Sequence, residues 1–107
     1  MAAIIVIASY RPREGQSAAF ETLVQEHVPL LRKGGYVSDR PAEILRELKG
    51  NCLIEIFAWA SQEAAVEAAS DPAVREHWAR MQAAADFVPL SSLAEGTKPF
   101  CHFSALA

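Results

Sequence analysis

Residues 52–59 (CLIEIFAW) form the segment that most limits how this chain can fold. Successive side chains of a β-strand point to opposite faces, and here both sets are apolar except for one charge, Glu55. A strand that is apolar on both faces lies inside a sheet and needs a cover on each side. Residues 3–10 (AIIVIASY) share this character, so the sequence predicts two apolar strands at the centre of one sheet.

Stretches with helical periodicity would cover one face of that sheet. Residues 16–33 repeat apolar side chains at i, i+3, i+4 and i+7, and Pro29 within them predicts a kink. A short helix is expected after Ser61, a suitable N-cap, and a further helix from Asp71, which a proline follows, to about residue 86. We expect these helical regions to pack on the same side of the sheet.

The remaining strand-like segments are residues 41–48, whose charges suit an edge strand, and residues 100–106. The resulting order, strand–helix–strand–strand–helix–strand, consists of two similar halves. The rules for short connections then favour an α+β fold of the ferredoxin-like βαββαβ type. Its four-stranded antiparallel sheet would have the order 4-1-3-2, with the helices on one face. A chain of 107 residues is expected to form one domain, residues 1–107.

The second face of such a sheet would be apolar and uncovered. Ile5 and Ile7 of the first strand and Ile54 and Ile56 of the third would point towards it. A bare apolar face of several hundred Å² is rare on a soluble monomer. The simplest cover is the same face of a second copy, so we expect a homodimer through the sheet face, related by a two-fold axis.

Charge and hydropathy exclude two classes of partner. The net charge is −3 and the basic residues are scattered, whereas a protein that binds a phosphate backbone needs a concentrated basic face. The apolar run at residues 1–8 is too short to span a membrane, and no other segment approaches that length. We expect neither nucleic acid nor membrane as a partner, and a cytoplasmic location.

The chain has two cysteines, Cys52 and Cys101, and they lie outside any CxxC motif. In the predicted strand order they are two strands apart, or roughly 9–10 Å between backbones. A disulfide spans at most roughly 7 Å between Cα atoms. Both thiols are therefore expected to stay reduced within one subunit, as is usual for an intracellular protein.

The phrase FAWASQEAA…DPAVREHWARM, together with the order of elements, resembles the dimeric α+β barrel superfamily. Within it, the chain is most similar to the antibiotic biosynthesis monooxygenase-like family. In that family the third strand commonly ends in an aromatic residue, followed by a short polar turn and an alanine-bearing helix. The matching positions here are Trp59, Ser61, Glu63 and Ala64.

The resemblance implies a dimeric α/β barrel with a pocket between helices and sheet in each subunit. Relatives of this kind include cofactor-independent oxygenases of aromatic polyketides and haem-degrading enzymes. Haem-degrading members carry an Asn on the first strand and a Trp on the second helix. The corresponding segments here, residues 8–10 and residues 63–70, contain neither, so no cofactor is expected.

Three residues are candidates for catalysis. Glu55 is the single charge in a central apolar strand, so it must pair, accept hydrogen bonds or become protonated. It could act as a base or anchor a ligand, or it could be a structural partner for one polar side chain. His27 falls in the apolar stripe of the first helix, where it could contact Glu55 and transfer a proton, or be a satisfied core histidine. His77 flanks the stripe of the later helix and could line the mouth of a pocket.

Four aromatic side chains could form the wall of a binding site for a flat molecule, although aromatics in a small core more often serve packing. These ligand-binding candidates are Tyr10, Phe57, Trp59 and Trp78. The three histidines lack the spacing of metal ligands, so no metal is expected.

Two functions remain open from the sequence. The first is binding of a small hydrophobic or aromatic molecule with monooxygenase-like, cofactor-independent chemistry. The second is a non-catalytic dimer that binds a ligand or another partner. A closed cavity of roughly 300 Å³ or more beside Glu55, faced by His27, Glu55 or His77, would favour the enzyme. The sequence names no substrate and no pathway.

Overall fold

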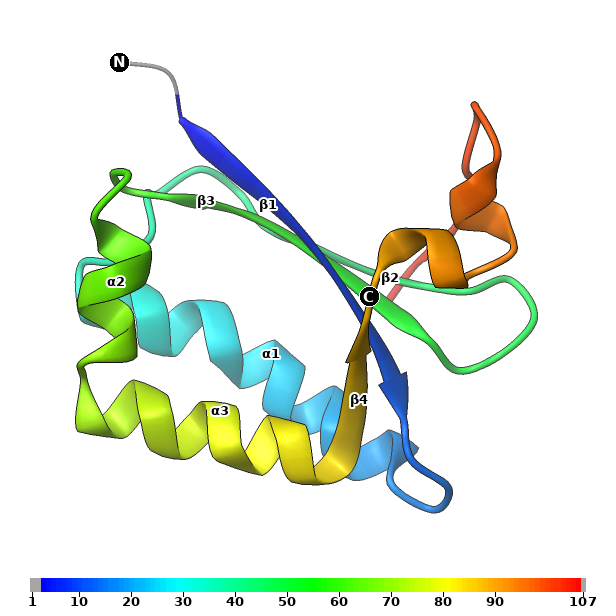
Figure 1. Cartoon of the computed structure of the whole chain (residues 1–107), viewed down its shortest axis with the longest axis horizontal. Helices are drawn as coiled ribbons and strands as arrows, with labels where there is room; N and C mark the ends of the chain where they lie inside the picture. Colours follow the sequence, from blue (N-terminus) through cyan, green and yellow to red (C-terminus); the bar gives the residue numbers. More distant parts are fainter. Residues whose placement is uncertain (1–2, 107) are drawn as a thin grey trace.

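Strand β3 (Leu53–Trp59) lies at the centre of an antiparallel sheet in the computed structural model, which describes residues 3–106. Within those residues the sheet has five strands in the order β4-β1-β3-β2-β5 (Figure 1). The other strands are β1 (Ile4–Pro12), β2 (Glu43–Arg46), β4 (Ala85–Val88) and β5 (Ser104–Ala105). The prediction that β1 and β3 are adjacent inner strands is confirmed. Residues 1, 2 and 107, which the single-domain expectation also covers, lie outside the described part.

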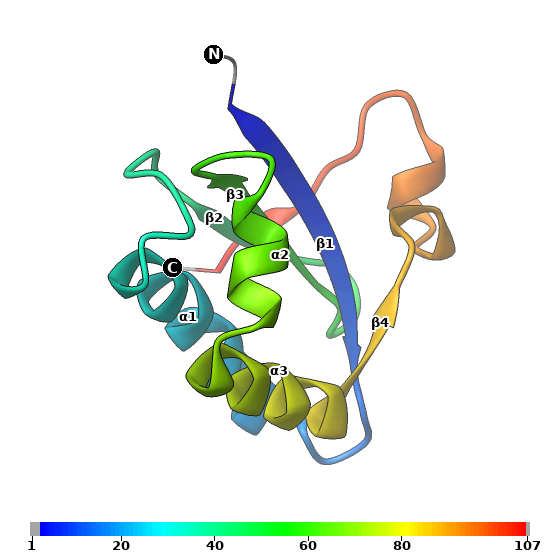
Figure 2. The same ribbon diagram turned by 60° about the vertical axis from the view of Figure 1, so that its left-hand side comes forward.

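Three helices of the described chain lie on one face of the sheet, as Figures 1 and 2 show. They are α1 (Ser17–Lys33), α2 (Ala64–Ala69) and α3 (Pro72–Ala84). The stripe of α1 faces the sheet, with Phe20, Val24 and Leu31 fully buried. Asp71 caps α3, since its carboxylate accepts a hydrogen bond from the backbone N–H of Ala73 at 2.9 Å. The predicted α+β class, with helices on one side of an antiparallel sheet, is confirmed.

The strand beside β1 differs from the expected one. Helix α3 ends at Ala84, and the chain turns directly into β4, where Phe87 pairs with Tyr10 and Val88 with Ser9. The prediction that residues 100–106 lie beside β1 in a four-stranded sheet was therefore wrong. Only residues 104–105 of that segment are extended in a strand, and they pair with β2 at the opposite edge. Pairing with β1 overrides the helical preference of the alanines at this boundary.

The outer face of the sheet, away from the helices, is covered in part by the chain itself. Residues 89–103, here called the C-terminal cap, include two short 3₁₀ turns (Leu90–Ser92 and Glu95–Thr97). Leu93 of the cap is buried against Cys52 and Ile54 of the outer face. The expectation that this whole face is bare was therefore wrong, because the cap covers the part of it around Cys52 and Ile54.

The outer face remains open at β1. Ile5 and Ile7 are 48% and 56% exposed.

The two cysteines differ in exposure, since Cys52 is buried beneath the cap and Cys101 is exposed. Neither of these described thiols is in a disulfide. Among residues 3–106, no helix is both long and apolar enough to cross a membrane.

Candidate functional site

Glu55 occupies the middle of β3 on the face that meets the helices, and its side chain is fully buried. Two donors reach its carboxylate. The hydroxyl of Tyr10 donates to Oε1 at 2.7 Å, and Nδ1 of His27 lies 3.0 Å from Oε1 and 2.9 Å from Oε2. The predicted contact between His27 and Glu55 is thus confirmed. A buried carboxylate without such donors would be strongly destabilising.

The second nitrogen of His27 also has a partner. The indole N–H of Trp78 donates to Nε2 of His27 at 2.8 Å. An indole nitrogen can only donate, so Nε2 must hold a lone pair. The imidazole proton then sits on Nδ1 and is donated to Glu55. The neighbours of His27 therefore fix it as a neutral ring with its basic nitrogen at Nε2.

These contacts join four elements into one chain of hydrogen bonds, called here the polar network. Trp78 comes from α3, His27 from α1, Glu55 from β3 and Tyr10 from β1. Burial, reinforced by the charge of Glu55 and the hydrogen bond to it, raises the pKa of Tyr10 far above its usual range. Tyr10 consequently remains a protonated donor to the carboxylate throughout the physiological range.

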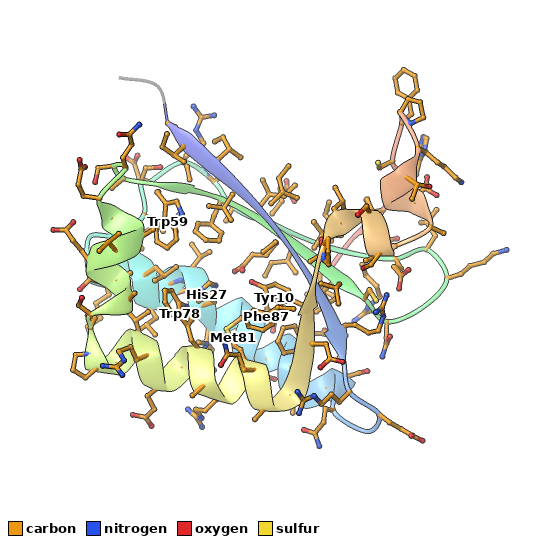
Figure 3. The ribbon with its side chains drawn as sticks, in the orientation of Figure 1. Tyr10, His27, Trp59, Trp78, Met81 and Phe87 are labelled. Carbon is orange, nitrogen blue, oxygen red and sulfur yellow. The ribbon has the colours of Figure 1, made fainter. Side chains whose placement is uncertain are left out.

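A cavity of about 380 Å³ lies beside the network, between β1, α3 and the end of β4. All four predicted ligand-binding residues line it, namely Tyr10, Phe57, Trp59 and Trp78. His27 also lines it, and Met81 and Phe87 complete a band of apolar side chains between the sheet and α3 (Figure 3). This space is called here the β1 cavity. Its walls suit a flat, largely apolar molecule.

The two other catalytic candidates do not line the β1 cavity. Glu55 lies behind His27, out of contact with the cavity. His77, expected at the mouth of a pocket, is buried, and its Nε2 donates to the backbone carbonyl of Leu23 at 2.8 Å. Its ring lies parallel to that of His27, with 6.0 Å between the ring centroids. His77 therefore ties α3 to α1, and of the three candidates only His27 meets the cavity.

Most of the other residues of the cavity wall were not singled out from the sequence, and Phe87 and Ser9 are two of them. Phe87 was placed just beyond the helix, whereas in β4 it packs edge-on against Tyr10, with ring centroids 4.9 Å apart. Ser9 lines the cavity as well, and its buried hydroxyl has no hydrogen-bond partner among the described residues. A small polar residue within an apolar strand was the one available signal for Ser9.

Within residues 3–106, no group of three or more His, Cys, Asp or Glu side chains is placed to hold a metal ion. The nitrogen of His27 that meets the cavity is instead bonded to Trp78.

Known proteins offer no guide beyond this geometry. No protein-family model, no curated protein and no solved structure matches the chain. The resemblance to the antibiotic biosynthesis monooxygenase-like family stays a prediction, and a function has to be inferred from the site itself.

Proposed function

We propose that the protein binds a small, flat, largely apolar molecule in the β1 cavity and that His27 removes a proton from it. One observation carries this proposal: the histidine on the cavity wall has its lone pair at Nε2 and is oriented through Nδ1 by a buried carboxylate. A general base held by a third group is the arrangement that activates many enzyme sites.

The carboxylate beside His27 would stabilise the protonated histidine that such a step produces. When Nε2 takes a proton, the ring becomes a cation, and the carboxylate of Glu55 lies 2.9 Å from its Nδ1. A neighbouring negative charge stabilises that cation in a buried site. Tyr10 holds the carboxylate in place from the other side. The polar network therefore supports both the neutral and the protonated form of the base, once Nε2 is free to react.

The family resemblance supplies the reaction class for this proposal, cofactor-independent monooxygenation. In that chemistry the substrate itself supplies the electrons for reaction with O₂. An aromatic hydroxyl compound becomes electron-rich when it loses its proton, so a largely apolar cavity with one base meets the basic requirement. Two features support it: the cavity exceeds the roughly 300 Å³ expected for such a site, and His27 faces it.

A non-catalytic role is the second candidate, and one observation favours it. In the structure the indole N–H of Trp78 already occupies Nε2 of His27. If that hydrogen bond persisted with a ligand present, the polar network would serve only to stabilise the core. The protein would then bind its ligand, or a partner, without acting on it.

We also propose a homodimer. The strands β4, β1, β3 and β2 with the helices on one face suit a ferredoxin-like core to which β5 is added. Ile5 and Ile7 leave an apolar area of the outer face open beside the cap. A second copy, related by a two-fold axis, would cover that area as in the dimeric α+β barrels that the sequence resembles.

The ionisation state of a bound hydroxyarene tests the proposed function. 2-Naphthol would be titrated with the protein, and its absorption spectrum would report naphthol or naphtholate. We expect binding to the wild type with a rise in the naphtholate fraction, and O₂ uptake with more electron-rich hydroxyarenes. His27→Gln should remove the naphtholate signal. The matched control is His77→Gln, which alters a neighbouring buried histidine outside the cavity.

The outcomes separate the two candidates. Binding of 2-naphthol that stays neutral, with no O₂ uptake across the hydroxyarenes, would support the non-catalytic role. Absence of binding for every aromatic compound tested would contradict the proposal that the β1 cavity is a ligand site.

A further inference from the structure

The hydrogen bond between Trp78 and His27 bears on the kind of ligand that can reach the base. His27 lines the β1 cavity, and the indole N–H of Trp78 donates to its Nε2 at 2.8 Å. His27 is only 4% exposed, so in the structure Trp78 is the donor that satisfies this nitrogen. Leaving the buried acceptor without a partner would be unfavourable.

We propose that Trp78 is a competing donor that sets how strongly the site prefers ligands with their own donor: its indole N–H occupies His27 Nε2 in the empty site, and a ligand with an acidic O–H or N–H donor displaces it. The ligand class is then a flat aromatic molecule that carries one such donor at its edge. This inference rests on the proposed function, because it requires a ligand in the β1 cavity beside His27.

The exchange of one donor for another leaves the buried acceptor satisfied. A hydroxyarene or an N–H heterocycle can replace the indole N–H hydrogen bond with one of its own. A ligand of the same shape without a donor would either leave Trp78 in place or expose Nε2 to an apolar surface. A site built around such an acceptor therefore discriminates against the analogue that lacks the donor.

Trp78 lies at the margin of the core rather than inside it. It is only partly buried, packs against both clusters of the inner core, and itself lines the cavity. Its displacement would therefore disturb fewer contacts than that of a fully buried side chain. Figure 3 shows Trp78 and His27 side by side between the sheet and α3.

Trp78 also selects the reactive tautomer of His27. Its N–H requires a lone pair on Nε2, and Glu55 requires a proton on Nδ1. The free protein therefore already holds the base in the form that a ligand needs. A ligand that brings its own donor meets the same lone pair, so binding requires no shift of the proton between the two ring nitrogens.

Two probes with the same ring system test the inference, 2-naphthol with its O–H donor and 2-methoxynaphthalene, in which a methyl group replaces the hydroxyl hydrogen. Each would be titrated into ¹⁵N-labelled protein while the indole N–H resonances are followed, with Trp59→Phe used to assign Trp78. We expect 2-naphthol to shift the Trp78 N–H resonance to the position of an unbonded indole. 2-Methoxynaphthalene has no donor to replace the indole N–H, so it should leave that resonance unchanged.

The variant Trp78→Phe removes the competing donor and keeps an aromatic ring. The preference for 2-naphthol over 2-methoxynaphthalene should rise by roughly fivefold, the range expected for one neutral hydrogen bond. Tyr36→Phe is the control, because Tyr36 is an aromatic residue outside the wall of the β1 cavity and its hydroxyl donates to Asp71 rather than to His27. Its preference should equal that of the wild type.

Several results would overturn the inference. Equal affinity for the two probes, with the same response of the Trp78 resonance, would contradict it and leave the β1 cavity as a ligand site. An unchanged preference in folded Trp78→Phe would do the same. Failure of both probes to bind would remove this inference together with the proposed function. If Trp78→Phe does not fold, the resonance of the wild type decides alone.

Discussion

Nδ1 of His27 lies 2.9 Å from Oε2 of Glu55, although the two residues are 28 positions apart and belong to different elements. The carboxylate has no exposed surface, so its donors come only from the protein. Tyr10 supplies the other one. Glu55 and Tyr10 can each be replaced by a side chain that removes one part of this arrangement.

Glu55→Gln keeps the shape of the side chain but replaces one of its two acceptor oxygens with an NH₂ group, which can only donate a hydrogen bond. The amide nitrogen would face a donor, either the Tyr10 hydroxyl or the Nδ1–H of His27. We expect the free energy of unfolding to fall by about 2–4 kcal/mol. Urea unfolding at neutral pH measures it. Glu43→Gln, at an exposed position of β2, is the control and should change stability by at most about 0.5 kcal/mol. Equal stability of the wild type and Glu55→Gln would contradict the account of the polar network.

Tyr10 should make the protein lose stability at alkaline pH. Its pKa is raised by burial and by Glu55, whereas in the unfolded chain it ionises near 10.0. The folded state therefore resists ionisation, and its advantage is complete below pH 10 and declines as the pH rises above it. Tyr10→Phe should cost about 1–2 kcal/mol at neutral pH and flatten the decline. Unfolding in urea at pH 8 and pH 11 measures both effects.

Tyr36→Phe is the control for that experiment. The pKa of Tyr36 is also raised, chiefly by its hydrogen bond to Asp71, but this tyrosine lies nearer the surface. Its substitution should flatten the alkaline decline less than Tyr10→Phe does. An alkaline decline that Tyr10→Phe leaves as steep as in the wild type would show that Tyr10 is not its source.

Leu93→Ala should loosen the C-terminal cap over the outer face. Leu93 is 2% exposed and packs on Cys52 and Ile54, so its truncation leaves a cavity there. We expect a loss of about 2–4 kcal/mol in the free energy of unfolding. In a Cys101→Ser background, the rate at which a thiol reagent modifies Cys52 should rise at least about tenfold, since local opening admits the reagent. Burial raises the pKa of Cys52, which keeps it unreactive in the intact protein.

The matching control is Leu48→Ala, at a position that is 64% exposed beyond β2. It removes the same atoms from a leucine that lies outside the cap. Its stability and the reactivity of Cys52 should remain near the wild-type values. Modification of Cys52 at the same rate in Leu93→Ala and the wild type would mean that the cap does not protect the thiol.

Ile7→Glu should disrupt the proposed homodimer. Ile7 is 56% exposed in one subunit, so a charge there has little effect on the folded monomer, whereas it would be buried at the interface. Native mass spectrometry should give a dimer mass for the wild type and a monomer mass for Ile7→Glu. Val66→Glu, which changes an exposed apolar residue on α2, should stay dimeric. A monomer mass for the wild type at micromolar concentration would contradict the dimer.

The centre of the fold could be predicted from the sequence because its signals are strong and local. The apolar character of β3 on both faces placed it inside the sheet, and Glu55 stood out as its single charge. The helical period of α1 placed His27 on the face that meets that strand. The alternation of side chains along β3 and the helical repeat of α1 were thus enough to indicate that His27 could contact Glu55.

The remainder depends on tertiary pairing that no local pattern reveals. The junction of Ala84 and Ala85 has neither glycine nor proline, so nothing in the sequence marks the end of α3. The register with β1 makes the next residues a strand and brings Phe87 to the cavity. The packing role of Trp78 was foreseen, but its hydrogen bond to His27 depends on the distance between α3 and α1, which spacing along one helix does not give.

The polar network also constrains the order in which the chain can fold. Its members come from β1, α1, β3 and α3, with up to 51 positions between hydrogen-bonded partners. A folding intermediate in which β3 is already buried but β1 or α1 is not yet docked would enclose the carboxylate of Glu55 without its donors. Such a state carries the full cost of an unpartnered charge, so partly assembled forms are disfavoured relative to both the native and the unfolded chain. Hydrogen exchange should therefore show the central strands and both long helices opening together, in one cooperative step.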